Sequence, residues 1–180
     1  MKIIFLGVQG SGKSTQAQQL ARKLNVPYIE MGQLLRDKTR DTDEQANKIK
    51  SALDVGDLVS NQITISILRK RLSQPDCQSG FILDGYPRNQ EQLEKLPNEI
   101  DQVFYVKISD EEAIKRLLAR ARHDDNRKSI ERRIELYHQQ TEPLLDYFKN
   151  QGVLTEIDGR PPIKDVYKEI IARLNEPDKN

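Results

Sequence analysis

One stretch near the start of the chain, residues 7–14, most constrains what this sequence can fold into. It reads Gly-Val-Gln-Gly-Ser-Gly-Lys-Ser and matches the pattern G-x-x-x-x-G-K-[ST]. The apolar run at residues 3–6 precedes it and is short and rich in branched and aromatic side chains, which predicts a buried strand. After it, apolar side chains recur at the spacing of one helix face, at Ala17, Leu20, Ala21 and Leu24. A strand, a glycine-rich loop and a helix in this order are the context in which the pattern binds phosphate.

The chemistry of such a loop explains its spacing. Glycines let the backbone turn tightly and point successive N–H groups inward, with a helix N-terminus behind them. Lys13 can then reach the β- and γ-phosphates of a nucleotide, and the Ser14 hydroxyl can approach Mg²⁺. The alternative is a glycine-rich turn before an ordinary helix. The matching elements on both sides favour triphosphate binding, but they do not say what is done with the triphosphate.

Length and composition exclude several classes of protein. The 180 residues suit one domain with a substantial core, and no apolar run approaches the length of a membrane span. Because Met1 leads straight into the first strand, we expect no secretory segment. The single cysteine, Cys77, excludes an internal disulfide and offers no metal-site spacing. A net charge of +1 argues against a nucleic-acid partner. We therefore expect a cytoplasmic monomer with neither nucleic acid nor a membrane as partner.

Short apolar strands alternate with helical segments along the rest of the chain. Strands are expected at residues 26–29, 81–83, 103–108 and 154–157, with Gly32 ending the first of these. Residues 33–72 have a helical pattern. A long helix is expected from about Ser129, kinked or restarted at Pro143. This alternation predicts an α/β fold with a parallel sheet covered on both faces and a ligand at the carboxyl ends of its strands.

Asp84 follows the buried strand at residues 81–83. In a chain with a phosphate-binding loop, an acid at this place is expected on the magnesium side of the site. The alternative is a loop aspartate that caps the next helix. We favour the magnesium-side role.

Arginines gather between residues 116 and 133, and two more, Arg36 and Arg88, come from elsewhere in the chain. When one nucleotide phosphorylates another, the attacking phosphate oxygen is already ionised near neutral pH, so no general base is needed. Two polyanions must instead be held together, and planar guanidinium groups suit that task. We expect Arg127, Lys128 and Arg132 to be solvated, and His123 and His138 to take no part in catalysis. This combination is typical of a nucleotide kinase.

Several motifs in the same order and spacing resemble those of the nucleoside monophosphate kinases, above all the adenylate kinase family. They are residues 7–16, Gly32-x-x-Leu35-Arg36, residues 56–59, residues 83–88 and Arg122-x-Asp124-Asp125-Asn126. The resemblance covers essentially the whole chain. It implies a P-loop three-layer α/β fold with a five-stranded parallel sheet, a helical monophosphate-binding insertion and a very short lid. The implied core is 1–29, 60–119 and 126–180, the insertion 30–59 and the lid about 120–125, all within one kinase domain.

The resemblance also implies a role for individual residues. ATP would be bound by Gly10, Ser11, Gly12, Lys13, Ser14, Thr15, Arg116, Arg120 and Pro161. AMP would be bound by Met31, Gly32, Arg36, Asp57, Leu58, Val59, Gly85, Tyr86, Pro87, Arg88, Gln92, Arg122 and Arg133. The catalytic residues would be Lys13, Arg88, Arg120, Arg122 and Arg133. Mg²⁺ would accompany ATP near Ser14 and Asp84, largely through water.

Departures from the family pattern leave the acceptor base open. The family loop usually has Pro where this chain has Gln9, and Gly where it has Ser14; we expect ATP binding to survive both changes. Met31 replaces the usual Thr beside the AMP base, and Asn89 replaces Thr or Ser. Residues 63–66 and 87–90 are similar to those of UMP/CMP kinases, whereas Gln92 favours AMP. A single residue between Arg120 and Arg122 leaves no room for a zinc-binding or long lid.

Three readings follow from these patterns. The first is transfer of phosphate from ATP to AMP with Mg²⁺, and the second is a UMP/CMP kinase. The third is a nucleotide switch or binding module that uses the P-loop without phosphorylating a second nucleotide. For a kinase, we expect residues 30–59 and the lid to close over both substrates, with Gly32 and Gly56 as hinges.

Overall fold

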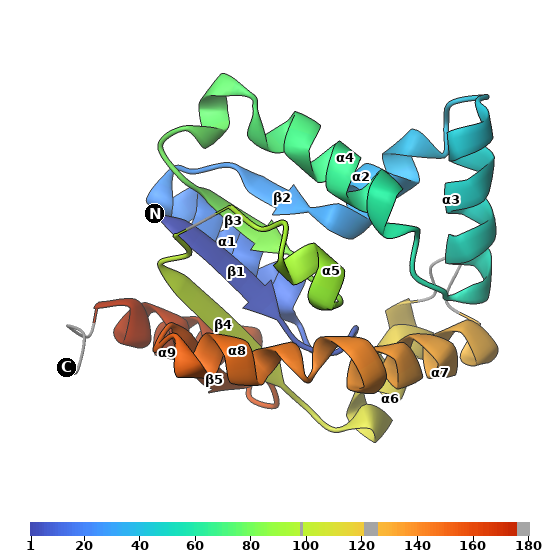
Figure 1. The fold of residues 1–180 in the computed structure, drawn as a ribbon. Coiled ribbons are helices and arrows are strands. Elements are labelled where there is room, and N and C mark those ends of the chain that lie inside the picture. Colours follow the sequence, from blue (N-terminus) through green and yellow to red (C-terminus); the bar gives the residue numbers. More distant parts are fainter. Residues whose placement is uncertain (98, 121–125, 176–180) are drawn as a thin grey trace.

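The computed structural model describes residues 1–97, 99–120 and 126–175. Within them, five strands form one sheet in which every neighbouring pair is parallel. The strands are β1 (Lys2–Leu6), β2 (Tyr28–Glu30), β3 (Phe81–Asp84), β4 (Gln102–Lys107) and β5 (Leu154–Asp158). Their order across the sheet is β2-β3-β1-β4-β5 (Figure 1). The predicted parallel α/β sheet is confirmed.

Helices connect the strands. They are α1 (Lys13–Leu24), α2 (Met31–Lys38), α3 (Glu44–Val55), α4 (Asn61–Leu72), α5 (Gln90–Leu93), α6 (Asp110–Arg120), α7 (Arg127–Leu136), α8 (Leu144–Asn150) and α9 (Ile163–Asn175). A 3₁₀ turn, η1, spans Pro75–Cys77, and a π-helical turn, η2, spans Tyr137–Thr141. Within the described residues, none of the helices is both long and apolar enough to span a membrane.

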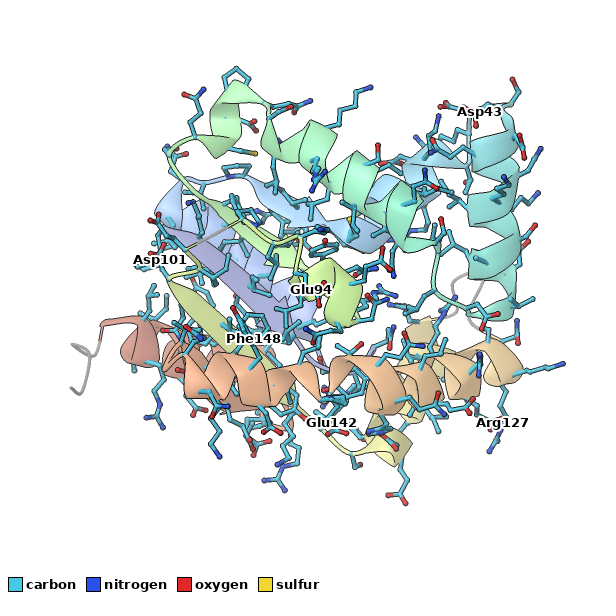
Figure 2. All side chains as sticks on the ribbon, viewed as in Figure 1. Asp43, Glu94, Asp101, Arg127, Glu142 and Phe148 are labelled. Atoms are coloured by element: carbon cyan, nitrogen blue, oxygen red, sulfur yellow. The ribbon has the colours of Figure 1, made fainter. Side chains whose placement is uncertain are left out.

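Alternate side chains of the strands build two hydrophobic layers. Ile3 and Phe5 of β1 pack with residues of α1 and α9, whereas Ile4 and Leu6 pack with residues of α2, α4 and α8. Phe148 of α8, which is 2% exposed, belongs to this second layer and points toward the sheet (Figure 2). Helices therefore cover both faces of the sheet, as the sequence predicts. α3 stands to one side of the sheet, and its end approaches α7 (Figure 1).

The boundaries differ from expectation in two places. α2 begins at Met31, directly after β2, so Gly32 lies inside a helix and does not end the strand. The helix expected from about Ser129 begins at Arg127, because the Asn126 side chain accepts the Ser129 N–H at 2.9 Å and caps it. The π-helical turn then interrupts the helix, and Pro143 precedes α8, a position where its missing N–H costs no helical hydrogen bond.

Candidate active site

The loop after β1 has the shape that its glycines predict. Gly7, Gly10 and Gly12 all have positive φ, a region that other residues rarely adopt. A Cβ on Gly10 would also lie 2.8 Å from the Ala113 carbonyl oxygen of α6. The loop is therefore held close to α6 and leads into α1, which begins at Lys13. Its N–H groups lie at a helix N-terminus, where an anion is favoured.

Lys13 lies at the centre of the polar groups around this loop. Its ammonium donates to the Val8 carbonyl oxygen at 3.3 Å. Burial lowers the pKa of Lys13, while the nearby carboxylates of Asp84 and Glu30 act to raise it. Burial makes the positive charge of Lys13 costly unless a negative charge lies near it. A phosphate beside this ammonium would supply that negative charge.

Asp84 ends β3 and is 1% exposed. The Tyr28 hydroxyl lies 3.0 Å from Asp84 Oδ2, while Oδ1 is buried without a hydrogen-bond partner in the described part of the chain. Burial and two neighbouring carboxylates raise the pKa of Tyr28, so its hydroxyl keeps its proton. Asn89, not Asp84, caps α5, because its side chain accepts the Gln92 N–H at 3.1 Å. This geometry excludes the helix-cap alternative for Asp84.

A cavity of about 280 Å³ opens at the carboxyl ends of the strands. Its lining draws on α1, α2, β3, α6 and α7 and on the loops between them. It includes most of the residues predicted to bind nucleotides or magnesium: Gly10, Gly12, Lys13, Ser14, Thr15, Met31, Gly32, Arg36, Asp57, Leu58, Val59, Asp84, Gly85, Arg88, Gln92, Arg116, Arg120 and Arg133.

The remaining predicted residues lie elsewhere. Ser11 and Pro161 line a second hollow of about 480 Å³, next to the first along the loop. Pro87 lines a small adjoining cavity of about 30 Å³. Tyr86 lines none of these three cavities: it is fully buried, and its hydroxyl donates to the Gln92 carbonyl oxygen at 2.9 Å. Arg122 and most of the expected lid lie outside the described residues.

Five arginines from four parts of the chain meet in the main cavity. They are Arg36 of α2, Arg88 after β3, Arg116 and Arg120 of α6, and Arg133 of α7. Several are already oriented by backbone oxygens: Arg88 Nε donates to Gly85 at 3.0 Å, Arg116 to Gly159 at 3.0 Å and Arg133 to Leu53 at 3.2 Å. Burial lowers the pKa of Arg88, which Asp84 opposes. The cavity is thus strongly cationic, with five arginines and Lys13 against three carboxylates, Glu30, Asp57 and Asp84, in its lining.

Of the basic residues set aside in the sequence, Arg127 and Arg132 form surface ion pairs and Lys128 is exposed, whereas His123 lies outside the described residues. Arg127, at the start of α7 (Figure 2), pairs with Glu131, and Arg132 pairs with both Glu135 and Asp57. His138 lies between Asp110 and Glu142, away from the cavity lining. Sequence reasoning missed Glu30, which lies 2.7 Å from Arg36. The only available signal was a carboxylate directly after a short strand, the same signal that identified Asp84.

Comparison with known proteins identifies the family. The family model described as adenylate kinase matches residues 5–153. The chain belongs to the adenylate kinase family. An adenylate kinase of Leptospira biflexa is 39% identical, with 96% of this chain and 99% of the relative covered. One of Archaeoglobus fulgidus is 35% identical over 97% and 98%, and adenylate kinase 1 of Synechocystis is 40% identical over 91% of each. Membership of the adenylate kinase family makes this chain a phosphotransferase enzyme.

Proposed function

We propose that the chain transfers the terminal phosphate of ATP reversibly to AMP, giving two molecules of ADP. One observation carries the proposal: the P-loop, five arginines from four parts of the chain and the loop at residues 57–59 line a single cavity. A nucleotide-hydrolysing switch needs the loop, but it does not need a second cationic subsite opposite. Membership of the adenylate kinase family supports the same reaction.

On the ATP side, the backbone of residues 10–15 and Lys13 hold the phosphates. Arg116 and Arg120 approach them from α6. The second hollow, which includes Pro161, receives the adenine. Arg116 lines both cavities, so it lies where bound ATP would extend from one cavity into the other.

On the AMP side, Arg36 and Arg88 hold the phosphate. The AMP base is surrounded by residues 57–59, Met31 and Gln92. Gly32 and Gly85 have no side chain, so the base and the phosphate can approach the backbone there. Met31 and Gln92 are each 1% exposed, so their orientations are set by packing before a ligand arrives. Tyr86 and Pro87 support this wall from behind.

Charge stabilisation is the main catalytic device of this site. The attacking AMP oxygen is ionised, so no side chain has to remove a proton. Lys13, Arg88, Arg120 and Arg133 surround the space between the two phosphate subsites and stabilise charge on the transferring group. Arg122, outside the described residues, is proposed to join them from the lid. Exclusion of water keeps AMP as the acceptor.

Mg²⁺ bound with ATP is part of the proposal, and the residues present fit it. Asp84 supplies a buried carboxylate oxygen that has no hydrogen-bond partner among the described residues, and Ser14 supplies a hydroxyl at the start of α1. Oxygen ligands of this kind suit Mg²⁺, which keeps several of its waters. The ion would neutralise phosphate charge and leave the in-line geometry to the protein. We propose no zinc site.

We further propose that the enzyme acts as a monomer in the cytoplasm, with residues 30–59 and a short lid at about 120–125 as the parts that move. The single cysteine suits a reducing compartment. The placement of α3 to one side of the sheet supports treating residues 30–59 as an insertion in the core.

A coupled assay with ATP and Mg²⁺ tests the reaction across AMP, GMP, CMP and UMP. The expected result is the highest kcat/KM for AMP. A preference for CMP or UMP would instead support the pyrimidine alternative, which Met31 in the base pocket favours.

Arg88→Ala separates a kinase from a switch. Loss of this guanidinium is expected to lower kcat/KM for AMP by about 10³, the order seen when an arginine that stabilises phosphoryl transfer is removed. Arg40→Ala, at an exposed arginine of the same charge, is the control. Transfer to AMP that survives Arg88→Ala would refute the kinase mechanism.

A further inference from the structure

Three side-chain amides form a connected cluster beside the cavity. Gln92 Nε2 donates to Asn61 Oδ1 at 2.9 Å, and Asn89 Nδ2 donates to the same oxygen at 2.9 Å. Asn61 Nδ2 in turn donates to Glu91 Oε2 at 2.6 Å. We call Asn61, Asn89 and Gln92 the amide cluster. Of the three, Gln92 alone lines the cavity, so the other two act only through it.

Two backbone N–H groups fix the direction of every amide in the cluster. The Arg88 N–H donates to Gln92 Oε1 at 2.8 Å, which forces Nε2 toward Asn61. The Gln92 N–H donates to Asn89 Oδ1 at 3.1 Å, which forces Nδ2 of Asn89 toward Asn61 as well. Asn61 therefore faces two N–H donors and must present its oxygen to both. Its own N–H donors are left for Glu91, so one arrangement satisfies all four side chains.

This arrangement decides what Gln92 offers to a base. Nε2 keeps one N–H and Oε1 keeps one lone pair beyond the bonds already made. The edge of a 6-aminopurine presents an acceptor at N1 and a donor at N6, which matches that pair. A 6-oxopurine presents the reverse, a donor at N1 and an acceptor at O6, and would fit only if the amide turned over. Turning it would place Nε2 against the Arg88 N–H and Oε1 against the Asn61 oxygen.

We propose that Asn61 is a positioning residue that locks the Gln92 amide and so makes the acceptor site select 6-amino over 6-oxo bases. The inference rests on the proposed function for its substrate. Asn61 is suited to the role because it is the first residue of α4, and the helix fixes its backbone. It lies 31 residues from Gln92 in the chain, so it holds the Gln92 amide from a separate element. Glu91 holds the far side of the same amide.

The test compares AMP with GMP in variants of the cluster. Asn61→Ala removes the shared oxygen and is expected to lower the AMP-to-GMP ratio of kcat/KM about fivefold, the effect of one partly buried hydrogen bond. The change should appear as a higher KM for AMP, with the KM for ATP and the kcat for AMP kept within about twofold. Gln62→Ala, at the exposed neighbouring position of α4, is the control.

A second variant restores the hydrogen bonds that fix the Gln92 amide, but with different atoms. In Asn61→Asp combined with Glu91→Gln, one carboxylate oxygen accepts both amide donors and the new glutamine amide donates to the other. The AMP-to-GMP ratio should return to that of the parent enzyme. AMP should raise Tm more than GMP does, and this difference should fall in Asn61→Ala and return in the double variant. The measurement reports binding and needs no turnover.

The outcomes separate the lock from the reaction itself. If the parent enzyme phosphorylates none of the four monophosphates, the proposed function fails. If the parent prefers AMP while Asn61→Ala keeps its AMP-to-GMP ratio, or the double variant fails to restore that ratio, the lock is refuted. A ratio that falls in Asn61→Ala and recovers in the double variant supports it.

Discussion

At the scale of single residues, Glu30 is an unusual partner for Arg36. Its carboxylate lies 2.7 Å from the guanidinium, and both side chains are mostly buried in the lining of the main cavity. A dianionic phosphate that enters the same place must compete with this carboxylate for the arginine. Glu30 therefore orients Arg36 in the empty site and repels the acceptor phosphate in the filled one. The repulsion is expected to dominate, because the phosphate can itself orient the guanidinium.

Glu30→Gln tests this competition. The variant removes one negative charge from the phosphate subsite, and we expect the KM for AMP to fall by roughly three- to tenfold at low salt, with a smaller change for ATP. Glu44→Gln makes the same change of net charge at an exposed position of α3 and should leave both constants unaltered. A higher KM for AMP in Glu30→Gln would mean that orientation of Arg36 matters more than repulsion.

At the scale of elements, the end of α3 is fitted against α7. Gly56 ends α3 with φ +81°, and a Cβ there would lie 2.5 Å from the Ser129 carbonyl oxygen. Arg132 of α7 reaches Asp57 at 2.7 Å, and Arg133 reaches the Leu53 carbonyl oxygen at 3.2 Å. The Arg132–Asp57 pair is about half exposed, so solvent screens its attraction and it contributes little to stability. The close backbone contact at Gly56 therefore determines how α3 sits on α7.

Gly56→Ala is predicted to destabilise the protein more than the same change at Gly152. Both glycines have left-handed backbones, but a Cβ on Gly152 meets nothing within 4 Å. The backbone strain of about 1 kcal/mol is common to both, and the overlap at Gly56 adds roughly 1–3 kcal/mol. Urea denaturation measures the difference in unfolding free energy, and AMP binding should weaken only in Gly56→Ala. Equal losses in the two variants would contradict a fitted α3–α7 contact.

His138 links η2 to the start of α6. Its hydrogen bonds to Glu142, at 2.7 Å, and to Asp110, at 3.0 Å, raise the pKa of His138 above its usual 6.5. Because the pKa is raised in the folded state, the stabilisation is fully present below the unfolded pKa and is lost as pH rises through the folded value. His138→Gln should therefore lower Tm at about pH 6 and have little effect at about pH 9.

Arg160→Gln provides the control for the His138 prediction. Arg160 pairs with Asp158, whose pKa is lowered to about 2 by that pair, so neither group titrates between these pH values. Its effect on Tm should be the same at both. A loss at His138 that does not depend on pH would mean that packing, not charge, makes the link.

Sequence patterns predicted most elements of this fold because β1, β3 and β4 are short, largely apolar runs and because α3, α5 and α7 begin after an Asp or Asn side chain that caps the helix. Asp84 is the last residue of such a strand and the P-loop follows another directly, so their positions could be predicted. Glu30 also ends a strand, but no local sequence pattern predicts that the Arg36 side chain lies against it. Asn61 is less predictable still, since its contact with Gln92 depends on how α4 and α5 pack. Contacts between distant segments are set by tertiary packing, which local patterns do not encode.

At the scale of the whole molecule, the size of the cavity implies motion. Its volume of about 280 Å³ lies at the lower end of what one small-molecule site occupies, ≈ 300 Å³, whereas the reaction needs two nucleotides end to end. Even with the second hollow available to the ATP adenine, the phosphates and AMP must fit between α2, α3, α6 and α7, which contribute residues to the cavity lining. We infer that residues 30–59 move away from α7 to admit the substrates and return to enclose them.

Spin labels on α3 and α7 test this opening. Lys48→Cys and Lys128→Cys place the labels at exposed positions of the two helices, in a Cys77→Ser background that removes the natural thiol. Without nucleotides, we expect a broad distance distribution with a long component. A bridged ATP–AMP analogue should narrow it toward the short distance, since it ties the arginines of both sides to one ligand. Gly56→Ala should enlarge the long component, because the overlap with Ser129 opposes the closed arrangement. A distribution that the analogue leaves unchanged would mean that both nucleotides bind without closure, and water would then have to be excluded by the ligands alone.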